Sequence, residues 1–153
     1  MKNKNNRAKR YGITYRQYPE IGKTIATMEG CEYDAIRILA KLVVNNSRYF
    51  NIAPFYEDED TEMESSYRGI VVCNTAEGDV YDEREGRREA YKKVMKKYHK
   101  DLDRKLRDAL KDVRELTAGI EHYMDKKGID YSSIAATEEL KAKKFGSYKA
   151  ENK

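Results

Sequence analysis

The chain lacks the features that mark membrane proteins and secreted, disulfide-bonded domains. It has no tryptophan, two prolines and two cysteines, and apolar residues make up 39% of its 153 positions. No apolar run approaches the roughly 20 residues that span a bilayer. The charged N-terminal stretch also lacks the apolar segment of a secretory signal. We therefore expect a cytoplasmic protein that does not enter a membrane.

Metal-site patterns are also missing. Cys31, Cys73, His99 and His122 are too widely separated to supply the close ligand pairs of a zinc site. In a chain without an export signal, two cysteines are better interpreted as small buried apolar side chains than as a disulfide. We therefore expect neither a metal nor a disulfide.

Catalytic motifs are scarce. The sequence contains no glycine-rich phosphate loop, serine-centred elbow or dinucleotide fingerprint. A metal-dependent nuclease needs converging carboxylates with a nearby lysine, and Asp79, Asp82, Glu85 and Lys92 are the candidates. Asp82 and Glu85 already have an explanation as helix-start carboxylates, so this alternative is the least favoured. We expect no catalytic residues and no cofactor.

Charge is abundant and segregated by sign. The 31 basic and 27 acidic residues nearly cancel to a net charge of +4. Residues 1–10 are basic and too polar to bury, so we expect a disordered tail. An acidic loop has the opposite charge. It consists of Glu57, Asp58, Glu59, Asp60, Glu62 and Glu64. Such a loop either imitates phosphate spacing in a cationic channel, forms a solvated linker, or pairs with basic residues of this chain.

The strongest functional signal is a basic helix. Seven of the residues between positions 87 and 100 are basic, against the single acid Glu89. The candidate binding residues are Arg87, Arg88, Lys92, Lys93, Lys96, Lys97, Lys100 and Arg104. Apolar residues recur at helical spacing on the other side, from Tyr91 to Met124. A cationic stripe on a rigid helix suits the phosphates of a nucleic acid, although a solvated helix face is the plain alternative.

The fold class predicted by these patterns is α+β, with a small antiparallel sheet, a packed helix and one long amphipathic, coiled-coil-like helix. The predicted elements are strands over 23–28 and 67–73, helices over about 32–45 and 83–127, and one further short helix in which Thr137 could be the cap. We predict one domain over 11–127 and an extension with a basic tail over 128–153. The long apolar stripe either breaks near Gly119 or pairs with another helix of this chain or of a second copy.

Residues 69–93 resemble a strand, acidic turn and lysine-rich helix module of small phage and prophage accessory proteins. The positions that match are Cys73, Asp79, Tyr81, Asp82, Glu85, Gly86 and Ala90. The turn before Asp79 is longer here, and Arg87 and Arg88 stand where the module is usually apolar. The resemblance implies a small binding protein of a mobile element acting in a bacterial host. It assigns no catalytic residue.

The leading functional hypothesis is a non-enzymatic phage inhibitor of a host nucleic-acid-targeting defence complex, of the anti-CRISPR type. The basic helix face and the acidic loop would bind the host ribonucleoprotein or its nucleic acid. The alternative is a phage DNA- or RNA-binding accessory protein. Neither hypothesis requires a cofactor or a membrane, and a homodimer through the long helix is compatible with both.

Overall fold

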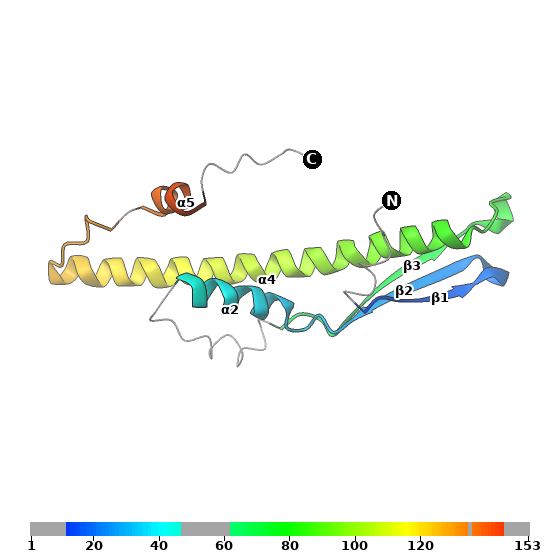
Figure 1. Cartoon of the computed structure of the whole chain (residues 1–153), viewed down its shortest axis with the longest axis horizontal. Coiled ribbons are helices and arrows are strands. Elements are labelled where there is room, and N and C mark those ends of the chain that lie inside the picture. Colours follow the sequence, from blue (N-terminus) through cyan, green and yellow to red (C-terminus); the bar gives the residue numbers. More distant parts are fainter. Residues whose placement is uncertain (1–11, 47–61, 135, 146–153) are drawn as a thin grey trace. The chain divides into compact units, whose positions relative to one another are not determined.

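The computed structural model describes residues 12–46, 62–134 and 136–145, and confirms the α+β class (Figure 1). The elements are β1 (Thr14–Tyr18), β2 (Lys23–Glu29), α2 (Asp34–Asn46), β3 (Ser66–Val72), α4 (Glu83–Lys127) and α5 (Thr137–Phe145). By its internal contacts the chain divides into two compact units, Met1–Leu110 and Lys111–Lys153. The division lies inside α4, whereas the sequence pattern favoured one domain over 11–127.

The sheet of the first unit has the order β1-β2-β3, and both pairings are antiparallel. Ile25 of the central strand is in register with Arg16 on one side and Ile70 on the other. A 3-10 turn ends at Gly22, whose φ of 59° lies in the left-handed region that favours glycine, and joins β1 to β2. Strands β2 and β3 match the predicted strands, whereas β1 was not predicted from the sequence.

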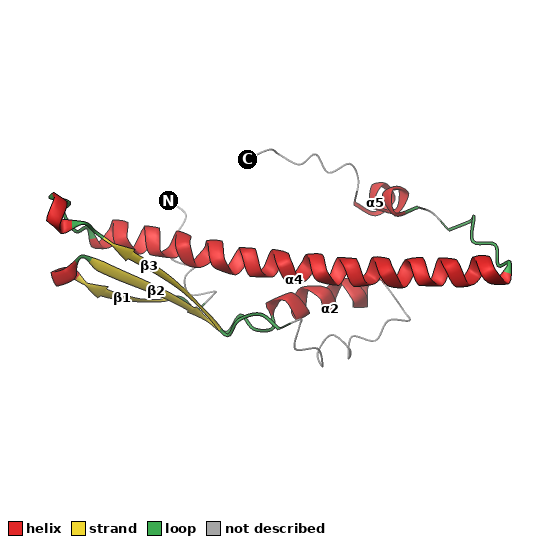
Figure 2. Ribbon diagram, turned by 180° about the vertical axis from the view of Figure 1, so that it is seen from behind, coloured by secondary structure: helices red, strands yellow, loops and turns green. Residues whose placement is uncertain are grey.

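The two faces of the sheet have different environments. The side chains of Thr24, Ala26 and Met28 on β2 are fully buried against α4. On the opposite face, Ile70 and Val72 of β3 are 46% and 64% exposed. Figure 2 shows α4 running along one side of the three strands. The long helix α4 therefore covers one face of the sheet, and Ile70 and Val72 remain exposed on the other face.

The helix α4 begins where the sequence predicted. Its N-cap is Asp82, whose Oδ1 accepts hydrogen bonds from the backbone N–H groups of Arg84 at 2.7 Å and Glu85 at 3.0 Å. These bonds satisfy two of the N–H groups that have no partner inside the helix. The helix continues through Gly119, which agrees with the predicted helix over 83–127 and rules out the alternative of a break near Gly119. It ends at Lys127, before Gly128, which has a φ of 66°.

The core of the first unit lies between the sheet, the start of α2 and the first turns of α4. Its buried members are Ile13, Ala26, Met28, Cys31, Ala35, Met63, Tyr67, Ala90, Val94 and Tyr98.

The structure contains no disulfide between the two cysteines, and both thiols are free. Cys31 is buried, as predicted, but Cys73 is only half-buried. The prediction that Cys73 is buried was therefore wrong, because this residue follows the last residue of an edge strand.

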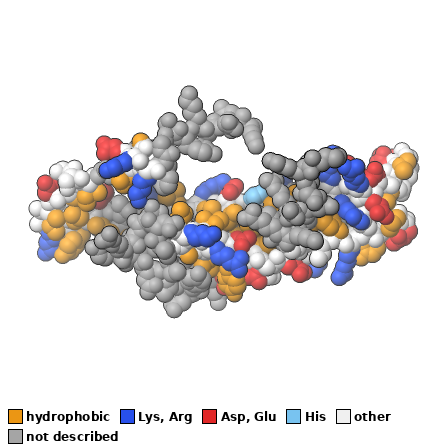
Figure 3. Space-filling model, in the orientation of Figure 1, with side chains coloured by type: hydrophobic (Ala, Val, Ile, Leu, Met, Phe, Trp, Pro, Cys, Tyr) orange, Lys and Arg blue, Asp and Glu red, His pale blue; other side chains and the backbone are white. Residues whose placement is uncertain are grey.

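The second unit consists of the C-terminal part of α4 and the short helix α5. Every side chain from Lys111 to Tyr123 is exposed in the described part of the chain. Several of these residues are large and apolar, and apolar side chains are visible at the surface in Figure 3. Helix α5 begins at Thr137, so the predicted short helix is present. Within the described ranges, no helix has both the length and the apolar composition that a bilayer span requires.

Candidate polyanion-binding face

The position of α4 on the sheet depends on residues without bulky side chains. A Cβ atom added to Gly69 of β3 would overlap the carbonyl oxygen of Ala90. One added to Gly86 of α4 would overlap the hydroxyl oxygen of Thr24. The backbone of the helix therefore lies directly against the strands. The buried row of α4 consists of Gly86, Ala90, Val94 and Tyr98, at intervals of four residues.

A second row at the same interval lies on the opposite side of the helix. We call it the basic row, and it consists of Arg88, Lys92, Lys96 and Lys100. Its members follow those of the buried row by two residues, which corresponds to about 200° around the helix. All four side chains are exposed. Each step of four residues rises about 6 Å, so the row presents regularly spaced cations on a rigid support.

The basic row is only partly neutralised by carboxylates. The guanidinium of Arg88 lies 2.5 Å from Glu85 and 3.5 Å from Glu89, and the ammonium of Lys92 lies 2.5 Å from Glu89. The hydrogen bond from Lys92 lowers the pKa of Glu89 below its usual value. The last two members of the row form no ion pair or hydrogen bond with any described residue. Free positive charge is therefore concentrated at the C-terminal end of the row.

Lys93 and Lys97 have a structural contact that the sequence did not indicate. The ammonium of Lys93 donates a hydrogen bond to the carbonyl oxygen of Ile70 at 2.9 Å. Lys97 donates to the carbonyl oxygen of Arg68 at 2.8 Å. Because β3 is an edge strand, these bonds occupy acceptors that no neighbouring strand uses. Both lysines are exposed, and their predicted role in binding stays a prediction.

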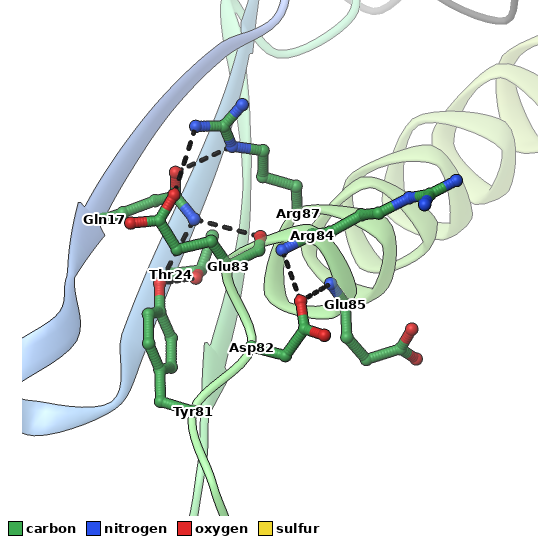
Figure 4. A network of polar contacts seen from close by, with 8 residues as sticks. All are labelled: Gln17, Thr24, Tyr81, Asp82, Glu83, Arg84, Glu85 and Arg87. Carbon is green, nitrogen blue, oxygen red and sulfur yellow. Dashed lines mark hydrogen bonds and ion pairs between the residues drawn. The ribbon is translucent and has the colours of Figure 1, made fainter.

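Arg87 belongs to a polar network at the start of α4 (Figure 4). Its Nε donates to the side-chain oxygen of Gln17 at 2.7 Å, and its guanidinium lies 3.8 Å from Glu83. The amide nitrogen of Gln17 donates to the backbone oxygen of Glu83 at 3.0 Å and to the hydroxyl of Tyr81 at 3.2 Å. That hydroxyl is also 2.8 Å from the hydroxyl of Thr24. Arg87 therefore joins α4 to β1, a strand that was not predicted from the sequence.

Arg104 belongs to a second network, centred on Asp101. The carboxylate accepts hydrogen bonds from the Tyr67 hydroxyl at 2.5 Å, from Arg104 at 2.6 Å and from the backbone N–H of Glu64 at 3.3 Å. Partial burial raises the pKa of Asp101, but the hydrogen bonds from Tyr67 and Arg104 lower it more, so the carboxyl titrates below its usual range. The guanidinium of Arg104 is therefore paired with a carboxylate of its own chain.

The acidic loop lies mostly outside the described residues. Glu57, Asp58, Glu59 and Asp60 fall in the range 47–61, which the structure does not describe. Glu62 and Glu64 are described, and both are exposed. Neither of these two carboxylates forms an ion pair with the basic row. The proposed roles of the loop stay predictions.

A hollow of about 420 Å³ lies beside the start of α2 in the first unit. Its lining includes Cys31, Asp34, Arg37 and Tyr98. The Asp34 carboxylate accepts a hydrogen bond from the Tyr98 hydroxyl at 2.9 Å and one from Arg37 at 3.4 Å. Burial, followed by the negative charge of Asp34, raises the pKa of Cys31 to about 11. A thiol in this state is a poor nucleophile, so the hollow does not have the chemistry of a cysteine-dependent active site.

No group of three or more metal-ligating side chains comes together in the part of the chain that the structure describes. Of the nuclease candidates, Asp82 caps α4 and Glu85 pairs with Arg88. Comparisons with family models, curated proteins and solved structures found no match to the chain. The resemblance to phage accessory proteins therefore stays a prediction.

Proposed function

We propose that the protein is a non-enzymatic binding protein that contacts the phosphates of a nucleic acid through the basic row of α4. The observation that carries this proposal is the position of the row, directly opposite the buried row and with two of its four cations unpaired among described residues. Cations on a rigid helix that neutralise phosphates release counterions and give salt-dependent affinity without base specificity.

A binding titration tests this proposal. Fluorescence anisotropy with single- and double-stranded DNA and RNA, at two salt concentrations, should show affinity that falls with salt. The double variant Lys96→Glu and Lys100→Glu should abolish binding or reduce the slope of log K against log salt by about 2, which corresponds to two lost phosphate contacts. Absence of salt-sensitive binding to every probe would overturn the proposal.

A charge-matched control separates contact at the row from overall charge. The double variant Arg16→Glu and Lys41→Glu makes the same change in net charge at exposed positions on β1 and α2. We expect this variant to lose much less affinity than the variant of the basic row. Equal losses in the two variants would show that binding follows net charge and not the row.

A narrower form of the function, which we also propose, is inhibition of a nucleic-acid-targeting defence complex in the cytoplasm of a bacterial host. The exposed residues Glu62 and Glu64 support a second, acidic surface. Capture of a host ribonucleoprotein from lysate should then survive nuclease treatment. Capture that disappears with nuclease would favour the simpler nucleic-acid-binding function, and chelator-sensitive cleavage of a probe would instead indicate a nuclease.

A further inference from the structure

The C-terminal part of α4 carries an exposed apolar stripe. The exposed stripe consists of Leu110, Val113, Leu116, Ile120 and Tyr123, whose exposed fractions are 51%, 44%, 47%, 49% and 58%. The ammonium of Lys127 lies 5.9 Å from the ring centre of Tyr123, but all five side chains remain exposed. This stretch continues the packed first part of α4, but its own apolar side chains gain no free energy of burial unless another surface covers them. The stripe therefore needs a partner surface.

The spacing of the stripe indicates that the partner is another helix. From Val113 onward the intervals are three, four and three residues, which is the alternation of a heptad repeat. A repeat of 3.5 residues keeps the apolar seam facing a second helix, whereas a sheet or an irregular surface imposes no such period. We propose that the partner is a second copy of this chain, with the two α4 helices antiparallel and related by a two-fold axis.

The lengths of the exposed and buried parts of α4 favour one alignment of the two α4 helices along each other. When Val113 faces Tyr123 of the second copy, Leu116 faces Ile120, and each contact occurs twice by symmetry. Lys127 of the second copy then faces Ala109. The stripe begins just after Ala109, which is 5% exposed, and the helix ends before Gly128. The partner helix therefore covers the stripe and stops where α4 becomes buried within its own unit.

Charge complementarity favours the same alignment. In this alignment Asp112 of one copy lies beside Lys126 of the other, at the edge of the apolar stripe. This pair of opposite charges also occurs twice by symmetry. A shift by one heptad places Lys105 beside Lys126 of the second copy, and a shift by two heptads places Asp112 beside its own counterpart. A parallel pair places Asp112 beside Thr117 and forms no ion pair. Like charges that face each other disfavour the two shifted antiparallel alignments, and the parallel pair lacks the favourable ion pair.

The alignment also accounts for Gly119. A glycine inside a helix is less favourable than alanine, and a Cβ atom at Gly119 would meet no described atom within 4 Å. Nothing in the described chain therefore requires a glycine at this position. In the proposed pair Gly119 faces Gly119 of the second copy beside the two-fold axis, where the missing side chains let the two helices approach closely.

Sedimentation of the full-length protein over a range of concentrations tests the proposal. We expect a monomer–dimer equilibrium, because the interface is short. Leu116→Asp places a charge in the seam and should abolish the dimer. Ala118→Asp introduces the same residue on the exposed outer side of the helix and should leave the dimer intact, with helicity checked by circular dichroism. A wild-type protein that stays monomeric, or a dimer insensitive to Leu116→Asp, would overturn the proposal.

Exchange of the flanking charges tests the alignment. Asp112→Lys and Lys126→Glu should each weaken the dimer several-fold, because each creates like-charge contacts. The combined variant should restore association, while Arg114→Glu, on an outer position, should have little effect. Failure of the combined variant to restore the dimer would overturn the proposed alignment.

Disulfide trapping tests the orientation. In a Cys73→Ser background, a mixture of Val113→Cys and Tyr123→Cys proteins should form the mixed disulfide under mild oxidation. A parallel pair would instead join Tyr123→Cys to itself, and that result would overturn the antiparallel arrangement. These experiments contain no nucleic acid, so their outcome is independent of the proposed binding function.

Discussion

The ammonium of Lys97 donates a hydrogen bond to the backbone carbonyl oxygen of Arg68 at 2.8 Å. Four residues earlier on the helix, Lys93 makes the equivalent bond to Ile70 at 2.9 Å. Two cations of the predicted binding face therefore satisfy acceptors along the open edge of β3. Lysine at a sheet edge also discourages pairing with another chain. These two lysines have a structural contact in addition to any contact with a ligand.

Substitution at neighbouring lysines should separate the two roles. Lys97→Met removes one hydrogen bond to the strand edge and should lower the free energy of unfolding by about 0.5–1 kcal/mol. Lys96→Met removes a cation that has no partner among the described residues, so it should weaken nucleic-acid binding without a loss of stability. Urea denaturation and anisotropy, measured on both variants, check the difference. Equal loss of stability in the two variants would contradict the structural role of Lys97.

The contact between β3 and α4 should not tolerate even a methyl group. Gly69→Ala places a Cβ atom against the carbonyl oxygen of Ala90 and close to the backbone nitrogen of Val94. We expect a loss of about 1–3 kcal/mol in the free energy of unfolding, because backbone atoms cannot move aside as a side chain can. Arg68→Ala, at the adjacent exposed position, should change stability by no more than about 0.5 kcal/mol. Thermal unfolding monitored by circular dichroism gives both values, and a neutral Gly69→Ala would contradict the close packing.

Most helices and strands could be located from local sequence patterns, but the contacts between them could not. Strand β2 and helix α4 follow from local signals: β-branched residues between glycines in the first case, and apolar periodicity after the Asp82 cap in the second. Strand β1 was missed because Tyr15 and Gln17, which face the helix, alternate with polar residues and do not form an apolar pattern. Its place is determined by pairing with β2, which is a non-local interaction.

The sequence was sufficient to predict which face of α4 is basic. It was not sufficient to predict the hydrogen bonds that the basic residues form. Helical geometry places Lys96 and Lys100 away from the core, so their exposure follows from the sequence. The bonds of Lys93 and Lys97 depend on which edge of the sheet lies beside α4. The bond from Arg87 to Gln17 likewise depends on β1, far away in the sequence. A sequence pattern contains no information on such distances.

Acid should remove the stabilising effect of the Asp101 network. Because the pKa of this carboxyl is lowered by folding, its contribution is complete above the unfolded-state pKa and is lost as the pH falls through the folded-state value. Asp101→Asn should therefore lower the free energy of unfolding by about 1–3 kcal/mol at neutral pH. The difference from wild type should shrink in acid.

Urea denaturation of the wild type and the Asn variant, at neutral pH and near pH 2, measures this convergence. Asp103→Asn serves as the control, since Asp103 is exposed and has no hydrogen bond or ion pair with a described residue. A difference between wild type and Asp101→Asn that is independent of pH would show that the lost stability does not depend on the charge of the carboxylate.

The two cysteines should differ in reactivity. Burial and the nearby charges of Asp34 and Glu32 raise the pKa of Cys31 to about 11, so its thiol stays protonated at pH 8. Its side chain is only 2% exposed, whereas Cys73 is half-buried. Iodoacetamide at pH 8 should therefore modify Cys73 well before Cys31, as followed by mass spectrometry of peptides. In urea the two rates should become similar, and rapid modification of Cys31 in the folded protein would contradict its burial.

The close approach at Gly69 also determines how the strands align. Side chains alternate between the two faces of a strand, so a slip of β3 by one residue would exchange its faces. Arg68 or Ile70 would then occupy the position against Ala90, where no side chain fits. Apolar residues occur on both faces of β3, so hydrophobicity alone discriminates weakly between the two alignments. The glycine excludes the wrong register by steric overlap, and thereby makes the pairing of β2 with β3 unique.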